Sequence, residues 1–188
     1  MNDRDDEGMD ATRLVTLDDA PVLAELLCAN REFLAPWDPV RNDDYFTVDG
    51  QRAVIAEALA RFGRGSALPH VILASGRLVG RITLNGIVRG PFQSCNVGYW
   101  LSADHNGRGL ASAALRHIKH VAFDDMRLHR IEAGTLLHNV RSQRVLERNG
   151  FVRFGIAPTY LHIAGEWQDH ALYQVVNDTP DASDRTIG

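Results

Sequence analysis

A glycine-rich turn in the middle of the chain is the segment best suited to binding chemistry. Residues 99–112 read YWLSADHNGRGLAS, so a strand-like pattern gives way to polar residues and then to Gly107 and Gly109 at the start of a helical pattern. Glycine lets the backbone approach a ligand closely. The first N–H groups of a helix are unpaired donors at its positive end. This combination predicts a phosphate or pyrophosphate site on the backbone of residues 107–112.

Two common phosphate motifs do not fit this turn. The P-loop pattern GxxxxGK[ST] does not occur in the sequence. The dinucleotide fingerprint GxGxxG requires a third glycine, and Ser112 stands in its place. From the spacing alone, a glycine-rich connection that binds no ligand remains open.

The turn and a second segment resemble a known family. Residues 106–111, NGRGLA, resemble the Q/R-x-x-G-x-G/A turn of the GCN5-related N-acetyltransferases, with Asn106 where glutamine or arginine is usual. Residues 138–151, HNVRSQRVLERNGF, resemble the N-x-x-S-x-x-[VL]-L-x-x-x-G-F signature of the RimJ/RimL branch, the ribosomal-protein alanine acetyltransferases. Further segments that match RimJ in particular are 30–41, 88–92, 128–131, 160–161 and 165–170.

The resemblance implies a fold and a cosubstrate. The expected fold class is α/β (α+β), a single domain with a mixed, mostly antiparallel twisted sheet of about seven strands and about four helices. Acetyl-CoA is expected in a splayed gap between the fourth strand, residues 95–101, and the fifth, residues 130–137. The residues expected to bind pantetheine through their backbone are Tyr99, Trp100 and Leu101, and those expected to bind the pyrophosphate are Gly107, Arg108, Gly109, Leu110, Ala111 and Ser112.

The implied reaction is attack of a neutral amine on a thioester. An α-amine has a pKa of about 7.7–8.0, against about 10.4 for lysine, so part of an N-terminal amine is already neutral near pH 7. By resemblance, Ser142 donates a hydrogen bond to the leaving thiolate, Asn139 contacts the pantetheine arm, and Tyr160 is an alternative donor. Glu132, on the strand beside the gap, is a candidate base.

Each of these residues also has a purely structural interpretation. Asn139 is well placed to cap the helix that follows it, because asparagine is a favoured N-cap. Ser142 in a first helical turn could be solvated, and Glu132 could form an ion pair. Thr159 stands where many relatives have an acidic residue, so a carboxylate base beside Tyr160 is in doubt.

The remaining polar residues of interest are a group near residue 40 and two histidines on one predicted helix. Trp37, Asp38 and Arg41 are candidates for a lip that holds the acceptor; a loop anchored by the tryptophan, with an Asp–Arg pair on its surface, is the alternative. No metal site is expected, because His117 and His120 share a helical face but lack an evident third ligand.

The surrounding patterns predict the elements that position these residues. Helices are predicted over 19–30, 51–62, 109–124 and 140–148, and strands over 13–17, 70–74, 78–84, 95–101, 130–137, 151–163 and 166–176. Asp18 is the expected N-cap of the first helix, and Gly98 suggests a bulge or a close backbone approach. Asn149, Gly150 and Phe151 predict the end of the last helix. Residues 31–50 are expected to be irregular.

Composition limits the function classes. The chain has 188 residues, 45% of them hydrophobic and 23% charged, which is ordinary for a globular protein. Residues 11–176 are expected to form the acetyltransferase domain, between disordered polar tails at 1–10 and 177–188. No long apolar run or secretory signal is evident, and two distant cysteines suggest a cytoplasmic setting. A net charge of −4 argues against nucleic-acid binding.

Three functions are open at this point. The favoured one is an acetyl-CoA-dependent N-acetyltransferase, a monomer or homodimer, acting on the N-terminal α-amine of a protein, with ribosomal protein S5 implied by the resemblance. The second is a small-amine or antibiotic N-acetyltransferase. The third is a non-catalytic acyl-CoA sensor or ribosome-assembly factor, suggested by the departures at Asn106 and Thr159 and opposed by the presence of Ser142.

Overall fold

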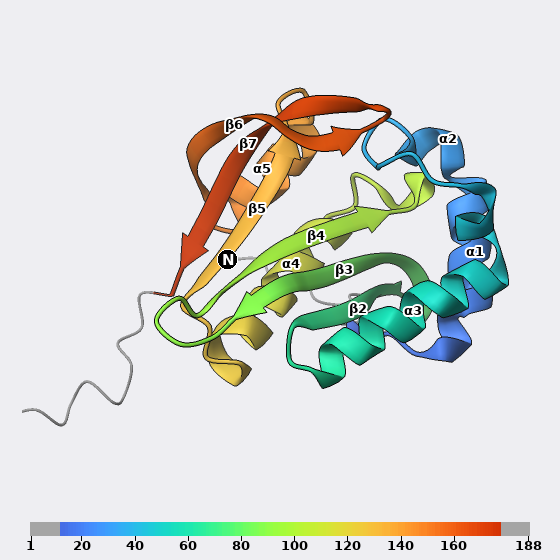
Figure 1. Ribbon diagram of the computed structural model, residues 1–188, viewed down its shortest axis with the longest axis horizontal. Helices are drawn as coiled ribbons and strands as arrows, with labels where there is room; N and C mark the ends of the chain where they lie inside the picture. Colours follow the sequence, from blue (N-terminus) through green and yellow to red (C-terminus); the bar gives the residue numbers. More distant parts are fainter. Residues whose placement is uncertain (1–11, 178–188) are drawn as a thin grey trace, which may run out of the picture.

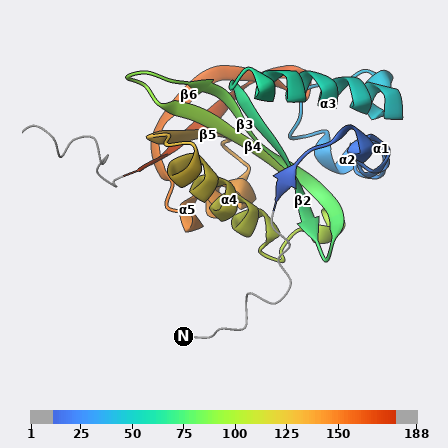
Figure 2. The same cartoon turned by 90° about the horizontal axis from the view of Figure 1, so that it is seen from below.

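A computed structural model describes residues 12–177, which form one seven-stranded sheet with helices on both faces (Figure 1, Figure 2). The strands are β1 (Arg13–Leu14), β2 (Ala67–Ala74), β3 (Arg77–Val88), β4 (Ser94–Leu101), β5 (Arg130–Leu136), β6 (Val152–Ile163) and β7 (Glu166–Val176). The helices are α1 (Ala20–Ala29), α2 (Arg31–Leu34), α3 (Val48–Gly63), α4 (Leu110–His120) and α5 (Val140–Arg148). The strand order is β1-β2-β3-β4-β5-β7-β6, and this mixed sheet confirms the predicted fold class.

Alternation along β4 divides its side chains between the two faces of the sheet. Val97 and Leu101 are buried in the main core together with Leu115 of α4. Trp100 packs on the other face, against the smaller cluster formed mainly by α1, α3 and neighbouring strands. In Figure 2 the helices α4 and α5 lie on one side of the sheet, and α1 and α3 lie on the other.

Strands β4 and β5 run side by side for only a short distance. Their parallel contact consists of the pairs Ser94–Arg130, Cys95–Ile131 and Asn96–Glu132. On their outer sides, β4 stays paired with β3 as far as Leu101, and β5 stays paired with β7 as far as Leu136. The inner edge of β4 beyond Asn96 therefore lies outside any ladder, which leaves backbone donors and acceptors open to a partner. The predicted gap between the fourth and fifth strands is present (Figure 1).

Helix α5 begins and ends as its sequence predicts. The side chain of Asn139 accepts a hydrogen bond from the Ser142 backbone N–H at 3.1 Å, so its capping role is confirmed. At the other end, Gly150 has φ +81° and the Phe151 N–H donates to the Leu146 carbonyl, which is a Schellman ending. Both ends together fix the helix that carries Ser142.

The start of α1 differs from the prediction. Asp19, not Asp18, is the N-cap residue, and its carboxylate accepts hydrogen bonds from the Arg13 guanidinium at 2.7 Å and from the Thr16 N–H at 2.8 Å. Burial disfavours the charged carboxylate, but the hydrogen bonds from Arg13 and Thr16 win, and the pKa of Asp19 is lowered. A 3-10 turn over Leu17–Asp19 shortens the strand that the sequence predicts over 13–17.

The segment 31–50 is more regular than its prolines and aromatic residues suggest. It contains α2, which was not predicted and which brings the number of α-helices to five instead of about four. It also contains the first residues of α3. Thr47 accepts a hydrogen bond from the Gly50 N–H at 3.0 Å, and this cap starts α3 before the predicted position at 51.

The structure differs from the predictions at three further places: Gly98, the end of α4 and the start of the predicted C-terminal tail. Gly98 pairs with Thr83 in regular register, and the irregularity lies in β3 between Asn85 and Val88. The helix predicted to end at 124 changes after His120 into a π-helical turn. The Asn177 N–H donates to the His129 carbonyl at 2.8 Å, so the described fold includes the first residue of the predicted C-terminal tail. The remaining residues of both predicted tails lie outside the described range.

Candidate active site

Two cavities meet where β4 and β5 separate. The larger, about 840 Å³, extends toward α3. The smaller, about 390 Å³, lies beside α5 and the start of α4. The residues that line both are Leu34, Trp37, Tyr99, Trp100, Asn139 and Ser142. A reacting group held at this junction can be reached from either cavity, which is the arrangement that a two-substrate transfer requires.

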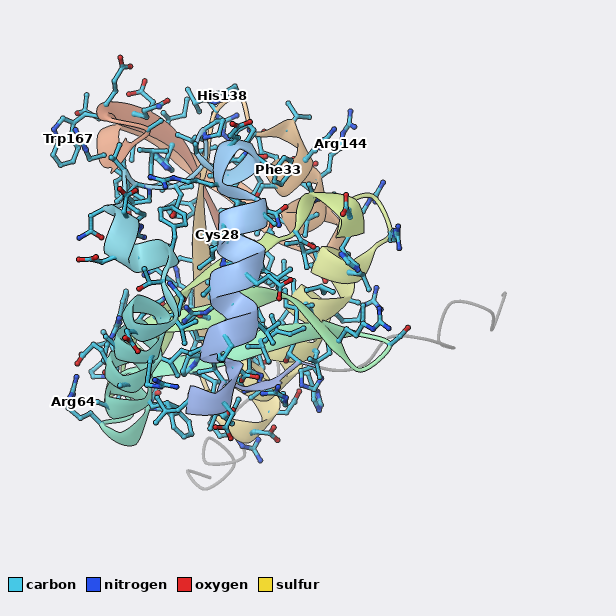
Figure 3. The ribbon with its side chains drawn as sticks, turned by 90° about the vertical axis from the view of Figure 1, so that its right-hand side faces the viewer. Cys28, Phe33, Arg64, His138, Arg144 and Trp167 are labelled. Carbon is cyan, nitrogen blue, oxygen red and sulfur yellow. The ribbon has the colours of Figure 1, made fainter. Side chains whose placement is uncertain are left out.

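The smaller cavity is suited to an extended, partly apolar ligand. Phe33 and His138 line it, and Figure 3 shows both at the same end of the molecule. Of the residues predicted to bind the cosubstrate, those that line it are Tyr99, Trp100, Leu101, Ala111, Asn139 and Ser142, and those that do not are Gly107, Arg108, Gly109, Leu110 and Ser112. The second group forms the turn and the first residues of α4, next to the cavity in sequence.

The glycine turn has a backbone that favours glycine at two positions. Gly107 has φ +77° and Gly109 has φ +78°. Gly109 is the N-cap residue of α4, and no described side chain caps the helix there. The first N–H groups of α4 are therefore available to an anion. The amide of Asn106 donates to the Ser102 carbonyl at 2.9 Å, so the residue that departs from the family pattern closes the turn itself.

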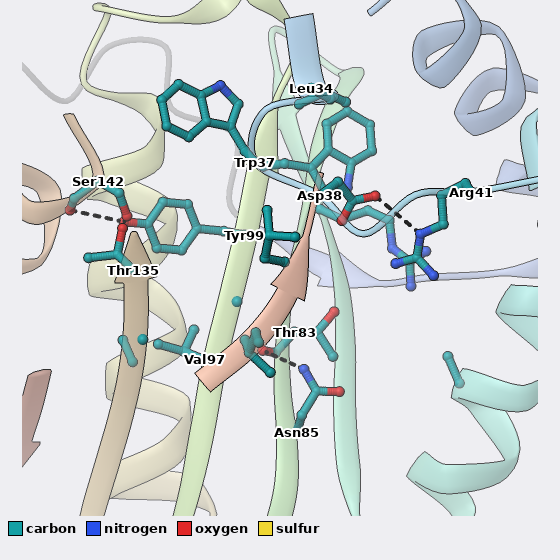
Figure 4. Close-up of a pocket in the computed structure, with 18 of the residues that line it drawn as sticks. Leu34, Trp37, Asp38, Arg41, Thr83, Asn85, Val97, Tyr99, Thr135 and Ser142 are labelled. Carbon is teal, nitrogen blue, oxygen red and sulfur yellow. Dashed lines mark hydrogen bonds and ion pairs between the residues drawn. The ribbon is translucent and has the colours of Figure 1, made fainter. Parts of the chain in front are cut away.

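Ser142 is held against a half-buried tyrosine, Tyr99 (Figure 4). Its Oγ lies 3.0 Å from the hydroxyl of Tyr99, and the same hydroxyl lies 3.4 Å from the Ser142 carbonyl. Burial raises the pKa of Tyr99 to about 12, against a smaller opposing effect of Ser142, so the phenol keeps its hydrogen at neutral pH. Either hydroxyl can be the donor in the 3.0 Å contact; when Tyr99 donates to the Ser142 Oγ, the serine hydrogen is free to point into the junction.

The sequence assigned Tyr99 to cosubstrate binding through its backbone and gave no signal for its side chain. Tyr99 and Ser142 are 43 positions apart and meet because α5 and the Tyr99 ring both pack on the main-core face of the sheet. Helical or strand periodicity cannot report such a contact.

The three residues predicted to hold the acceptor come together at the larger cavity. Asp38 accepts a hydrogen bond from Arg41 at 3.2 Å, and Figure 4 shows this pair beside Trp37. The Arg41 guanidinium lies 4.6 Å from the ring centre of Tyr45. The Trp37 ring lies 5.4 Å from that of His138, so it bridges the two cavities. The predicted Asp–Arg pair exists, and it lines the cavity.

Two predicted catalytic residues lie away from the junction. Glu132 belongs to the paired end of β5, does not line either cavity, and forms an ion pair with Arg130 at 2.8 Å. Its alternative interpretation as an ion-paired carboxylate is thus supported. Tyr160 is 44% exposed and also lines neither cavity, but its ring lies 5.5 Å from that of His170. The Thr159 N–H donates to the Asp169 carboxylate at 2.8 Å.

The larger cavity contains a histidine that the sequence analysis did not single out. His170, on β7, is 3% exposed and lines the cavity. Its Nδ1 lies 2.9 Å from the Gln168 carbonyl oxygen, which can only accept a hydrogen bond. Nδ1 therefore carries the ring hydrogen, and Nε2 is the unprotonated nitrogen of the neutral ring. The only sequence signal was its place in the matching segment 165–170, which did not indicate a role.

The His170 and Tyr160 rings both pack over Gly134 of β5. A Cβ at Gly134 would lie 3.7 Å from the His170 Cδ2 and 3.5 Å from a ring carbon of Tyr160, which are ordinary van der Waals distances. Both rings therefore lie against the strand next to the gap.

Metal and membrane features are not found in residues 12–177. This range contains no group of three His, Cys, Asp or Glu side chains that could hold a metal ion. None of its helices is long and apolar enough to cross a membrane.

Comparison with known proteins agrees with this geometry. Residues 12–152 match the family described as Acetyltransferase (GNAT) domain. The chain is 38% identical to the Bacillus subtilis (strain 168) protein named "Probable N-acetyltransferase YjcK", over 88% of this chain and 92% of that protein. It is 34% identical to the [Ribosomal protein uS5]-alanine N-acetyltransferase of Escherichia coli (strain K12), over 90% and 87%.

Solved structures give the same result. The ribosomal-protein-S5-alanine acetyltransferase of Vibrio fischeri superposes with a TM-score of 0.85 at 32% identity and covers 89% of this chain and 93% of its own. Mycobacterium smegmatis RimJ in complex with CoA-disulfide gives a TM-score of 0.85 at 30% identity, over 94% and 84%. The resemblance to the RimJ/RimL branch is thus confirmed. The chain belongs to the GNAT acetyltransferase family and is an acetyl-CoA-dependent N-acetyltransferase.

Proposed function

We propose that this enzyme works in the cytoplasm and transfers acetyl to the N-terminal α-amine of a protein, with ribosomal protein S5 as the first candidate. The observation that carries the proposal is the junction of two cavities at Ser142 and Tyr99, where an amine from one side meets a thioester from the other. Its similarity to two S5-alanine acetyltransferases supports the choice of acceptor.

The cosubstrate would enter by the smaller cavity. Its pantetheine arm would pair with the open inner edge of β4 at Tyr99–Leu101, which is strand addition by a ligand. The pyrophosphate would bind the N–H groups of residues 107–112, and exposed Arg108 would add positive charge. Asn139 lines this cavity while its side-chain oxygen caps α5, so both of its predicted roles are compatible.

Substitution of Gly109 by valine is expected to weaken acetyl-CoA binding by about tenfold or more, because a branched side chain strains the left-handed backbone and projects where the pyrophosphate must approach. Isothermal titration with acetyl-CoA measures the effect. Gly65→Val is the matched control: Gly65 has φ +71°, its Cβ would meet open space as at Gly109, and it lines neither cavity. Equal affinities for the two variants would remove the turn from the binding site.

Two residues, His170 in the larger cavity and Ser142 at the junction, supply the two proton-related functions of the reaction. The amine nitrogen bonds to the thioester carbon, the carbon–sulfur bond breaks, and one N–H proton must leave. Nε2 of His170 is placed to accept that proton, since it is the acceptor nitrogen of a ring in the acceptor cavity. Ser142, oriented by Tyr99, donates a hydrogen bond to the departing thiolate, whose parent pKa is about 8.5 if it behaves like cysteine.

The carboxylates of the larger cavity are weaker candidates for this base. Asp38 is paired with Arg41, and Glu57 is paired with Arg64 at 3.2 Å. Each would have to give up an ion pair to accept a proton, whereas His170 would not.

Thiol release from acetyl-CoA with a panel of acceptors tests the proposed function. The panel contains peptides that start with alanine or serine, the same peptides with a blocked N-terminus and an internal lysine, folded S5, and aminoglycosides. Release only with free N-termini is expected. Release with aminoglycosides would transfer the function to small-amine modification. Acetyl-CoA binding with no release for any acceptor would favour a non-catalytic sensor.

A further inference from the structure

The larger cavity is bigger than an amine and an acetyl group require. From the junction it continues along β3 and under α3, where Arg81, Thr83, Asn85 and Arg61 line it. Substrate sites of roughly 300–1,000 Å³ hold whole drug-sized ligands, so this extension has room for the groups that follow the acceptor amine.

Arg81 is the unusual residue of this extension. It lies opposite Trp100 in the β3–β4 ladder, so its backbone is one strand away from the junction. Burial lowers the pKa of the Arg81 guanidinium, with a small opposing influence of Tyr45. Within the described residues, no hydrogen bond or ion pair joins its side chain to another protein group. Arg81 is half-buried, so its charge loses part of its hydration without gaining a protein partner, and an anionic ligand would offset that loss.

The other charges of the cavity do not neutralise Arg81. The lining contains three arginines and two carboxylates: Arg41, Arg61, Arg81, Asp38 and Glu57. Both carboxylates are already ion-paired, Asp38 with Arg41 and Glu57 with Arg64. The inner part of the cavity therefore carries unmatched positive charge.

Two polar side chains share the cavity wall with this arginine. Arg81, Thr83 and Asn85 alternate along β3, so all three belong to one face of the strand. Figure 4 shows Thr83 and Asn85 next to each other on this wall. The Thr83 hydroxyl follows Arg81 on this face, and the Asn85 amide, whose nitrogen lies 3.5 Å from the Thr83 carbonyl oxygen, comes next. Of these groups the guanidinium matches a planar carboxylate, because arginine binds carboxylates with two parallel hydrogen bonds.

We propose that Arg81, with Thr83 and Asn85, forms a carboxylate-binding subsite that selects acceptors bearing an acidic side chain within a few residues of the amine. This inference rests on the proposed function, because it assumes that a peptide enters the larger cavity. It adds a substrate class to the reaction: acidic N-terminal sequences are favoured over neutral or basic ones.

A peptide set tests the subsite. Hexapeptides with a free N-terminal alanine carry either glutamate or glutamine at position 2, 3 or 4. For wild-type enzyme, at least one glutamate peptide is expected to have about a tenfold higher kcat/KM than its glutamine counterpart. In Arg81→Gln this preference should disappear, so that each glutamate peptide and its glutamine counterpart have the same kcat/KM.

The control is Arg77→Gln, which removes the same charge from the exposed start of β3 outside the cavity and should keep the preference. Titration of the same peptides into the CoA-bound enzyme measures their affinity whether or not transfer occurs. Equal affinity and equal kcat/KM for every pair, or a preference that survives Arg81→Gln, would overturn the subsite. A binding preference without acetyl transfer to any free N-terminus would overturn only the proposed function.

Discussion

Replacement of His170 by glutamine is expected to lower kcat for acetyl transfer by about 10²- to 10⁴-fold. Glutamine can still hydrogen-bond in the cavity but cannot accept the amine proton. Because Nδ1 of His170 is committed to the Gln168 carbonyl, the loss concerns the single acceptor nitrogen Nε2. Affinity for acetyl-CoA should be nearly unchanged, since His170 lines only the acceptor cavity. Thiol release at saturating substrates, together with isothermal titration, measures both quantities.

Two control variants separate a base from a structural residue. Tyr160→Phe keeps the ring that packs against His170, so its kcat should stay close to the wild-type value. His70→Gln is the matched control: His70 is 9% exposed, lines neither cavity, and has its pKa lowered to about 4 by burial and by His117. A normal kcat in His170→Gln would show that water removes the amine proton.

The second large effect is expected for Ser142→Ala, with kcat lowered about 10²-fold and acetyl-CoA affinity changed much less. The alanine variant loses the hydroxyl that would donate to the leaving thiolate but keeps the Asn139 cap, because that cap uses the backbone N–H of residue 142. Thiol-release assays at saturating substrates measure kcat, and isothermal titration with acetyl-CoA measures the affinity. Ser142→Thr, which keeps a hydroxyl, should recover part of the rate.

Tyr99 is expected to act through Ser142 and is therefore a positioning residue. Tyr99→Phe should lower kcat about tenfold, the effect of losing one partly buried hydrogen bond, and should have little further effect in a Ser142→Ala background. Ser66→Ala, which removes a hydroxyl that donates to the Arg61 carbonyl outside the junction, serves as the control. Additive losses in the double variant would mean that Tyr99 contacts substrate by itself.

Local sequence patterns predicted the parts of the site that are built within one turn of chain. The cap at Asn139, the left-handed Gly107 and Gly109, and the ending at Gly150 all depend on neighbours a few residues away. Their spacing therefore contains the necessary information. The gap between the fourth and fifth strands was predicted from the family resemblance, whose matching segments span both sides of it.

The remaining parts depend on contacts between distant elements. His170 lines the larger cavity because β7 lies between β5 and β6 in the sheet. Tyr99 contacts Ser142 although the two residues are 43 positions apart in the sequence. The prediction of Asp18 as a cap failed because Arg13 on β1 pairs with Asp19 instead. Glu132 had the right residue type on the right strand, but it stands on the paired side of the gap with Arg130. Periodicity places a residue on a face and does not report its partner across the fold.

The short contact between β4 and β5 has a consequence for the enzyme's stability and its turnover together. In the sheet, four strands (β1 to β4) lie on one side of this contact and three (β5, β7 and β6) lie on the other. Only three residue pairs join the two parts of the sheet. A cosubstrate that pairs with the open edge of β4 would form hydrogen bonds that β5 does not supply there. Because it would bind only the folded sheet, folding and ligand binding are thermodynamically linked. Acetyl-CoA at a free concentration of 100 times its Kd would raise the free energy of unfolding by about 2.7 kcal/mol. The same linkage opposes release of the spent CoA, because its departure breaks the hydrogen bonds that it makes to the open edge of β4.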